Sequence, residues 1–167
     1  MNSVYASLGT TVFDLMSRLA ADKGAVNLGQ GFPEHDGPRD ILEAAARAIM
    51  DGPNQYPPMR GLPDLRQAVA AHYNEHHGLD LDWQREVTVT SGATEAIAAA
   101  LLAFIEPGDE VVLFEPLYDA YLPMVRRAGG VPRIVRLTPP HWRYERAEVS
   151  AAFSDKTRVV IVNTPLN

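Results

Sequence analysis

The 167-residue sequence contains no cysteine, which excludes disulfides, metal–thiolate bonds and a cysteine nucleophile. It also lacks a surplus of positive charge, because 15 basic residues stand against 21 acidic ones and the formal charge is −6. Binding a polyanion requires a basic surface, so this balance argues against nucleic acid as a partner. The longest apolar run, residues 96–105, is too short to cross a bilayer, and no secretory signal is evident. We therefore expect a cytoplasmic protein with no membrane partner.

Lysine is scarce as well, since Lys23 and Lys156 are the only two in the chain. Lys23 lies at the end of the first predicted helix, and Lys156 directly precedes the last predicted strand. Any reaction that proceeds through a covalent bond to a lysine amine therefore has two candidates in this sequence.

The pattern of apolar residues predicts helices that alternate with strands along most of the chain. Helices are expected at residues 11–22, 39–50, 63–77, 93–105, 119–128 and 144–153. Strands are expected at residues 26–28, 87–90, 111–114, 131–137 and 158–162. This order predicts the α/β fold class, with a mainly parallel sheet flanked by helices. Because parallel sheets are covered on both faces, a chain that stops soon after a buried strand is expected to be truncated.

The segment Ser91-Gly92-Ala93-Thr94 follows a predicted strand and begins a predicted helix. Backbone N–H groups at a helix start, together with the positive end of the helix dipole, can bind a phosphate that small residues allow to approach. An ordinary N-cap formed by Ser91 or Thr94 explains the same residues equally well. The segment is neither a Walker A loop nor a GxGxxG fingerprint, which argues against a nucleotide.

Two pairs of side chains follow predicted strands at their carboxyl ends, where ligands of open α/β sheets bind. Tyr118 and Tyr121 can stack on a planar ring, although packing against neighbouring helices is the simpler interpretation of each. Asn163 and Asn167 can donate to a ring oxygen, although an Asx turn is the simpler interpretation of these amides.

Two loops carry residues that can reach a ligand. Gly31 belongs to the glycine-paired segment at residues 29–33, which can bring backbone amides to a carboxylate or can be a sharp turn alone. Tyr56 lies in a loop with three prolines, where its hydroxyl is available for hydrogen bonding.

A metal site is not expected, although His72 and His76 have the i, i+4 spacing that can hold zinc on a helix. No glutamate occupies the position that an HExxH motif requires, and no third ligand is evident. A solvated helix face is the better interpretation of this pair.

Seven segments follow one another in an order and spacing that chance rarely produces. They are residues 27–33, 54–56, 61–66, 88–96, 107–111, 115–121 and 163–167. Together they resemble the class I/II aminotransferases of fold type I, and the LGQGFP and NQY segments are typical of the kynurenine, glutamine and methionine aminotransferase branch. The resemblance extends from about Leu8 to Asn167.

The resemblance implies pyridoxal 5'-phosphate as the cofactor, with a role for each matched residue. In this family the turn that begins the helix binds the cofactor phosphate through backbone amides, a role that falls to Gly92, Ala93 and Thr94. Tyr118 matches the residue that stacks on the pyridine ring, and Asn167 matches the amide that hydrogen-bonds the phenolic oxygen. The cofactor is an electron sink, and the protein supplies its anchor and its ring contacts.

The resemblance also implies substrates, a partner and a domain division. Tyr56 matches a tyrosine that reaches the cofactor phosphate of the neighbouring subunit, which implies a homodimer. Gly31 and Phe13 match positions beside an amino acid or 2-oxo acid substrate. Residues 1–37 would form an N-terminal arm and the start of the small domain. Residues 38–167 would form the N-terminal half of the large cofactor-binding domain.

The family's reaction needs a lysine that forms a Schiff base with the cofactor. In the family this lysine lies far beyond the last matched segment, so neither Lys23 nor Lys156 is assigned to it and no catalytic residue is expected. We therefore expect an N-terminal fragment of an aminotransferase that is inactive by itself. A fold type I C–S lyase, which shares these segments, is one alternative. An aminotransferase-like sensing domain is another, but such domains usually follow a helix-turn-helix domain for which the sequence leaves no room.

Overall fold

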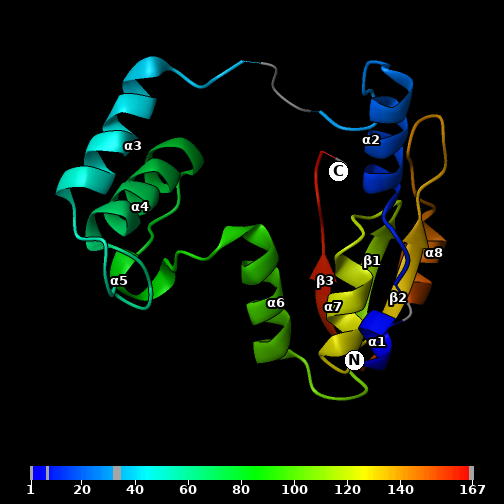
Figure 1. Ribbon diagram of the computed structural model, residues 1–167. Helices are drawn as coiled ribbons and strands as arrows, with labels where there is room; N and C mark the ends of the chain where they lie inside the picture. Colours follow the sequence, from blue (N-terminus) through cyan, green and yellow to red (C-terminus); the bar gives the residue numbers. More distant parts are fainter. Residues whose placement is uncertain (1, 7, 32–34, 166–167) are drawn as a thin grey trace. The chain divides into compact units, whose positions relative to one another are not determined.

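The computed structural model describes residues 2–6, 8–31 and 35–165 (Figure 1). The elements are, in chain order, α1 (Ser3–Ala6), α2 (Val12–Lys23), α3 (Arg39–Asp51), α4 (Pro63–His77), α5 (Trp83–Glu86), α6 (Gly92–Phe104), β1 (Glu110–Glu115), α7 (Tyr121–Arg127), β2 (Val131–Arg136), α8 (Arg146–Ala152) and β3 (Thr157–Ile161). The chain divides into two compact units. The sheet unit comprises Met1–Leu19 with Gly92–Asn167, and the helical unit comprises Ala20–Ser91.

The sheet unit contains three parallel strands in the order β2-β1-β3. The central strand pairs Leu113 with Ile134 on one side and with Ile161 on the other. The strands expected at residues 111–114, 131–137 and 158–162 are all present. Their observed bounds differ from the expected ones by one residue at one end or at both ends. The predicted α/β fold with a parallel sheet is therefore confirmed.

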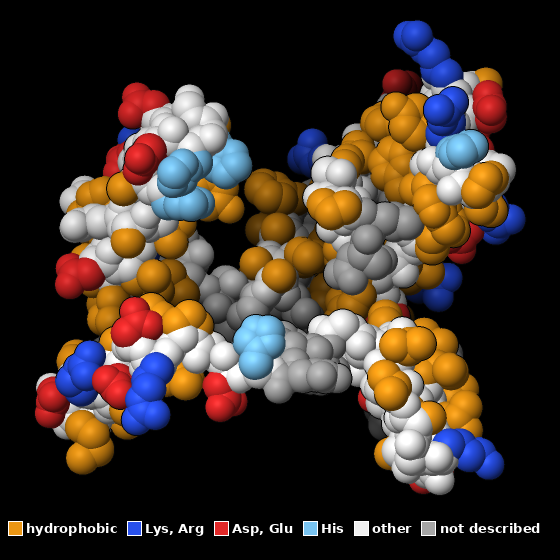
Figure 2. Space-filling model, turned by 90° about the horizontal axis from the view of Figure 1, so that it is seen from above, with side chains coloured by type: hydrophobic (Ala, Val, Ile, Leu, Met, Phe, Trp, Pro, Cys, Tyr) orange, Lys and Arg blue, Asp and Glu red, His pale blue; other side chains and the backbone are white. Residues whose placement is uncertain are grey.

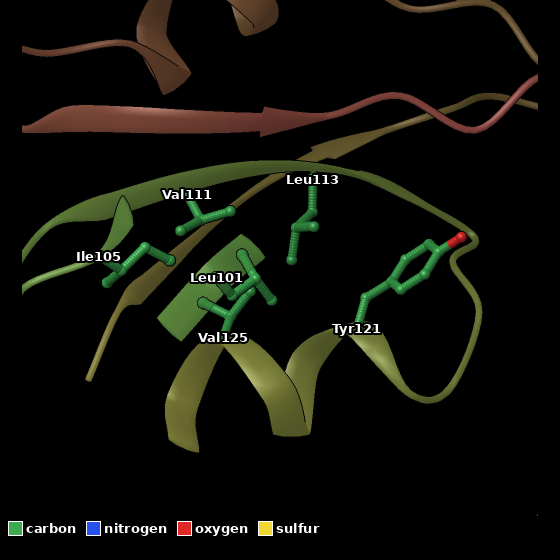
Figure 3. Packing of buried hydrophobic residues seen from close by; sticks show 6 residues of the cluster. All are labelled: Leu101, Ile105, Val111, Leu113, Tyr121 and Val125. Carbon is green, nitrogen blue, oxygen red and sulfur yellow. The ribbon is translucent and has the colours of Figure 1, made fainter. Parts of the chain in front are cut away.

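The two faces of β1 are covered by different helices, as the alternation of side chains along a strand requires. Val111 and Leu113 point toward α6 and α7, where they pack with Leu101, Tyr121 and Val125 (Figure 3). On the opposite face, Val112 packs with Val135 of β2 and Ala152 of α8. The sheet is thus the middle layer of three, and the carboxyl ends of all three strands share one edge.

The helical unit has one buried charged side chain, Arg66 of α4, among its described residues. Its Nε donates a hydrogen bond to the carbonyl oxygen of Val87 at 2.9 Å. Its Nη2 donates to the carbonyl oxygens of Trp83 at 2.7 Å and Gln84 at 2.9 Å. The guanidinium carbon also lies 5.3 Å from the centroid of the Trp83 ring, which is within the range of a cation–π contact. One side chain therefore holds α5 and the segment after it against α4.

Two predicted strands are absent from the structure. Residues 87–90, all described, form no strand, because their backbone groups are bonded elsewhere: the Val87 carbonyl to Arg66, and the Val89 N–H to the Arg60 carbonyl at 2.9 Å. Residues 26–28 are also irregular, because the Asn27 side chain accepts a hydrogen bond from the Gly29 N–H at 2.9 Å and closes a turn.

Gly61 is expected to tolerate no side chain, because it has a φ of +97° and lies directly against Val89. A Cβ atom at this position would lie 2.6 Å from Val89 Cγ2. We expect Gly61→Ala to lower the free energy of unfolding by about 2–3 kcal/mol, from backbone strain and overpacking together. Urea denaturation measures the change.

Gly78, the C-cap of α4, provides the matched control for that prediction. It is left-handed with a φ of +63°, but a Cβ atom there would meet nothing within 4 Å. Gly78→Ala should therefore lower the free energy of unfolding by about 1 kcal/mol, from left-handed backbone strain alone. Equal losses in the two variants would show that contact with Val89 is unimportant.

Many large apolar side chains remain on the surface, some of them visible in orange in Figure 2. Neither α2 nor α3 has a buried residue, although each carries several leucines, isoleucines or methionines. Among the described residues, no helix is both long enough and apolar enough to span a bilayer.

Candidate functional site

A hollow of about 230 Å³ lies in the sheet unit between the first turns of α6 and α7. We name it the anchor hollow, and its lining residues are Ala93, Thr94, Ile97, Tyr118, Ala120, Tyr121 and Met124. Three residues of the predicted cofactor site, namely Ala93, Thr94 and Tyr118, are therefore brought together, although 24 or more positions separate the tyrosine from the other two in the sequence.

The first turn of α6 forms one side of this hollow. The helix begins at Gly92, which has a φ of +79°, and a Cβ atom there would meet nothing within 4 Å. Gly92, Ala93 and Thr94 are all exposed and lie at the positive end of a 13-residue helix, which attracts anions. Thr94 lies inside the helix and is therefore not its N-cap. Ser91, which directly precedes the helix, is the remaining candidate for that role.

Tyr118 and Tyr121 form the opposite side of the anchor hollow. Their rings make an edge-to-face contact, with centroids 5.7 Å apart and planes at 67°. The Tyr121 N–H donates to the Tyr118 carbonyl oxygen at 3.1 Å, which ties the start of α7 to the loop after β1. Tyr121 is buried in the core, as the packing interpretation predicts, and Tyr118 is half-buried and packs against that core; both residues also line the hollow.

A second hollow, of about 520 Å³, opens at the carboxyl edge of the sheet and also includes Tyr118. We name it the aromatic hollow; it is lined by Leu113, Phe114, Pro116, Leu117, Tyr118, Tyr121, Leu137, Trp142, Tyr144, Val149, Ile161, Val162, Asn163 and Thr164. Neither Trp142 nor Tyr144 was predicted to belong to a site, although the aromatic residues between β2 and α8 were an available signal. Tyr144 contacts Phe114, with ring centroids 6.2 Å apart.

The remaining predicted residues are distributed over both units. Phe13 is half-buried in α2, within the part of that helix that belongs to the sheet unit. Gly31 and Tyr56 belong to the helical unit, where Gly31 is exposed and Tyr56 is 95% exposed. Asn167 lies outside the described residues. Asn163, two positions past β3, lines the aromatic hollow.

The other chemical candidates lie outside both hollows. Lys23 is exposed at the end of α2, and Lys156 is exposed immediately before β3. His72 and His76 are exposed on α4. In the part of the chain that the structure describes, no group of three or more histidine, aspartate or glutamate side chains could hold a metal ion.

Comparison with known proteins gives a family match over most of the chain. The family model described as "Aminotransferase class I and II" matches residues 23–167. The methionine aminotransferase of Escherichia coli (strain K12) is 46% identical over 160 residues, which are 96% of this chain and 42% of that protein. The probable N-succinyldiaminopimelate aminotransferase DapC of Mycobacterium tuberculosis is 51% identical over 160 residues, or 95% of this chain and 40% of that protein.

A solved structure agrees with the sequence matches. The structure of YbdL from Escherichia coli, whose report identifies a methionine aminotransferase function, superposes with a TM-score of 0.94 at 45% identity. The superposition covers 100% of this chain and 44% of the YbdL chain. The chain thus spans about two fifths of the length of the relatives that it matches.

Proposed function

Since the chain belongs to the class I and II aminotransferase family, we propose that the whole protein is a pyridoxal-phosphate-dependent aminotransferase. It would move an amino group between an amino acid and a 2-oxo acid. Members of this family use pyridoxal phosphate, and the present chain would contribute part of the cofactor's binding site. The proposal includes a cytoplasmic location, a homodimer, and no nucleic-acid or membrane partner.

The observation that carries the proposal is the anchor hollow. It places a helix N-terminus with exposed small residues, Ala93 and Thr94, opposite the half-buried ring of Tyr118. An anion anchor next to an aromatic face suits a molecule that carries both a phosphate and a planar ring. Gly92 fits the same role, because its φ of +79° is one that favours glycine, and open space lies where a Cβ atom would be.

The residues of this chain would bind and orient the cofactor. Backbone amides of Gly92, Ala93 and Thr94 would hold its phosphate, and the Tyr118 ring would lie against its pyridine ring. Asn167 would donate to its phenolic oxygen. When bound, pyridoxal phosphate supplies an electron sink for the substrate's reacting carbon.

Three further residues would contact the substrate or the cofactor of a second subunit: Tyr56, Gly31 and Phe13. The exposed hydroxyl of Tyr56 is available to the cofactor phosphate of a neighbouring subunit, and Gly31 and Phe13 would lie beside the substrate. We retain the division of the chain at residue 37, between an arm with the start of the small domain and the large domain, as part of this proposal.

The 167-residue chain alone is expected to form no covalent bond with pyridoxal phosphate. Its two lysines, Lys23 and Lys156, are exposed at the end of α2 and before β3, and neither lines the anchor hollow. After incubation with the cofactor, borohydride reduction and dialysis, mass spectrometry should find no stoichiometric label. A label confined to one of these lysines would contradict this expectation.

Transamination by the purified whole protein tests the proposed function. Panels of amino acids are incubated with 2-oxoglutarate or pyruvate, and the new amino acid and the new 2-oxo acid are measured in equal amounts. Release of ammonia from a thioether amino acid without formation of a new amino acid would identify a lyase instead. Absence of transamination with every donor and acceptor would overturn the proposal.

A further inference from the structure

Three histidines gather on the last turns of α4: His72, His76 and His77. The ring centroids of His72 and His76 are 4.5 Å apart with planes at 60°, and those of His72 and His77 are 6.3 Å apart. All three side chains are exposed, and Figure 2 shows histidine side chains in pale blue grouped on the surface at the upper left. The cofactor contacts proposed above involve none of these residues.

In place of the solvated helix face expected from the sequence, we propose that His72 and His76 form a two-ligand site for a divalent transition-metal ion, with copper(II) as the preferred ion. Residues i and i+4 lie on the same face of a helix, one turn apart, so two imidazoles can approach one ion. Imidazole nitrogen is a ligand that suits copper, nickel and zinc, and copper(II) is the most strongly bound of these ions at a given site.

The separation of the two rings allows both imidazoles to bind the same ion. A metal–nitrogen bond of about 2.0–2.1 Å places the ion about 3.2 Å from the centre of each imidazole. Two rings at a right angle around the ion would then have centres about 4.5 Å apart, whereas a tetrahedral angle would require about 5.2 Å. The 4.5 Å between the ring centroids of His72 and His76 is therefore short enough for one ion to bind both imidazoles.

His77 is outside this ligand pair. It follows His76 directly, so its side chain leaves the helix about 100° further around the axis. Its ring lies 5.1 Å from that of Tyr73, four residues earlier, and is farther from His72, at 6.3 Å, than the His76 ring is. Since no third histidine or carboxylate joins the site among the described residues, water would fill the remaining positions around the ion. His77 is therefore the matched control for His72 and His76.

The experiment is a titration of the full protein with copper(II) alone, by calorimetry, for the wild type and three variants. His72→Ala and His76→Ala should each weaken copper binding about tenfold or more, because each removes one of two ligands of the chelate. His77→Ala should change the affinity by less than about twofold. Circular dichroism confirms that these exposed substitutions leave the fold intact.

Electron paramagnetic resonance of the copper-loaded protein identifies the ligands independently. The wild type and His77→Ala should show coupling to two imidazole nitrogens, and His72→Ala and His76→Ala should show fewer. Unchanged copper affinity in His72→Ala and His76→Ala would overturn the proposal, as would an equal loss in His77→Ala. Because neither readout involves pyridoxal phosphate or turnover, the result is independent of the proposed aminotransferase activity.

Discussion

Replacing Arg66 with methionine is expected to lower the free energy of unfolding by about 3 kcal/mol, through loss of the buried hydrogen bonds that hold residues 83–87 against α4. Arg66 is 7% exposed and donates to three carbonyl oxygens. Methionine keeps most of the apolar stem but donates no hydrogen bond, so the carbonyls of Trp83 and Val87 lose a partner. The contact between the guanidinium group and the Trp83 ring is lost as well.

Arg85→Met is the matched control, because Arg85 is exposed in the short helix α5. Surface substitutions of this kind change stability by about 0.5 kcal/mol or less. Unfolding in urea can be followed by the fluorescence of Trp83 in a Trp142→Phe background, since the chain has two tryptophans. Equal stability of the Arg66 and Arg85 variants would mean that the three hydrogen bonds contribute nothing net.

Leu113→Ala is expected to lower the free energy of unfolding by about 3 kcal/mol, the range that large-to-small substitutions in packed cores give. Leu113 is fully buried at the centre of β1, between β2 and β3 and beneath α7. The substitution removes apolar surface from the core and leaves a cavity, because the paired strands on both sides prevent the backbone from closing it.

Leu102→Ala is the control for this prediction, because Leu102 is 64% exposed on α6 in the same unit. Its loss of stability should be at most about 0.5 kcal/mol. Urea denaturation of both variants, followed by circular dichroism, gives the two values. A Leu113→Ala loss no larger than that of Leu102→Ala would show that the β1 core is not tightly packed.

The sequence predicts the fold correctly where a strand-like run of apolar residues also finds a neighbouring strand to pair with. The strand around Leu113 is predicted by its run of apolar residues, and the structure pairs it on both sides. Residues 87–90 carry an equally strand-like pattern, but a strand also needs a partner, and here the hydrogen bonds go to Arg66 and Arg60. No local sequence pattern indicates that an arginine such as Arg66 donates hydrogen bonds to backbone carbonyl groups far along the chain.

The site could be predicted only in part, for a related reason. Ala93, Thr94 and Tyr118 are each ambiguous alone, and their order along the chain led to the expectation that they meet. The structure brings these three to one hollow. Trp142 was not predicted, because it belongs to none of the matched segments; it lies in the connection between β2 and α8, which hydrogen bonds between the Thr138 and Arg143 backbones close.

The affinity of the whole protein for pyridoxal phosphate in Tyr118→Ala and Tyr118→Phe tests the central claim most directly. Phenylalanine keeps the aromatic face and alanine removes it, so Tyr118→Ala should bind the cofactor about tenfold more weakly, while Tyr118→Phe stays within about twofold of the wild type. Fluorescence titration with the cofactor measures both dissociation constants, and circular dichroism checks the fold. Wild-type affinity in Tyr118→Ala would contradict the assignment of the anchor hollow as the cofactor site.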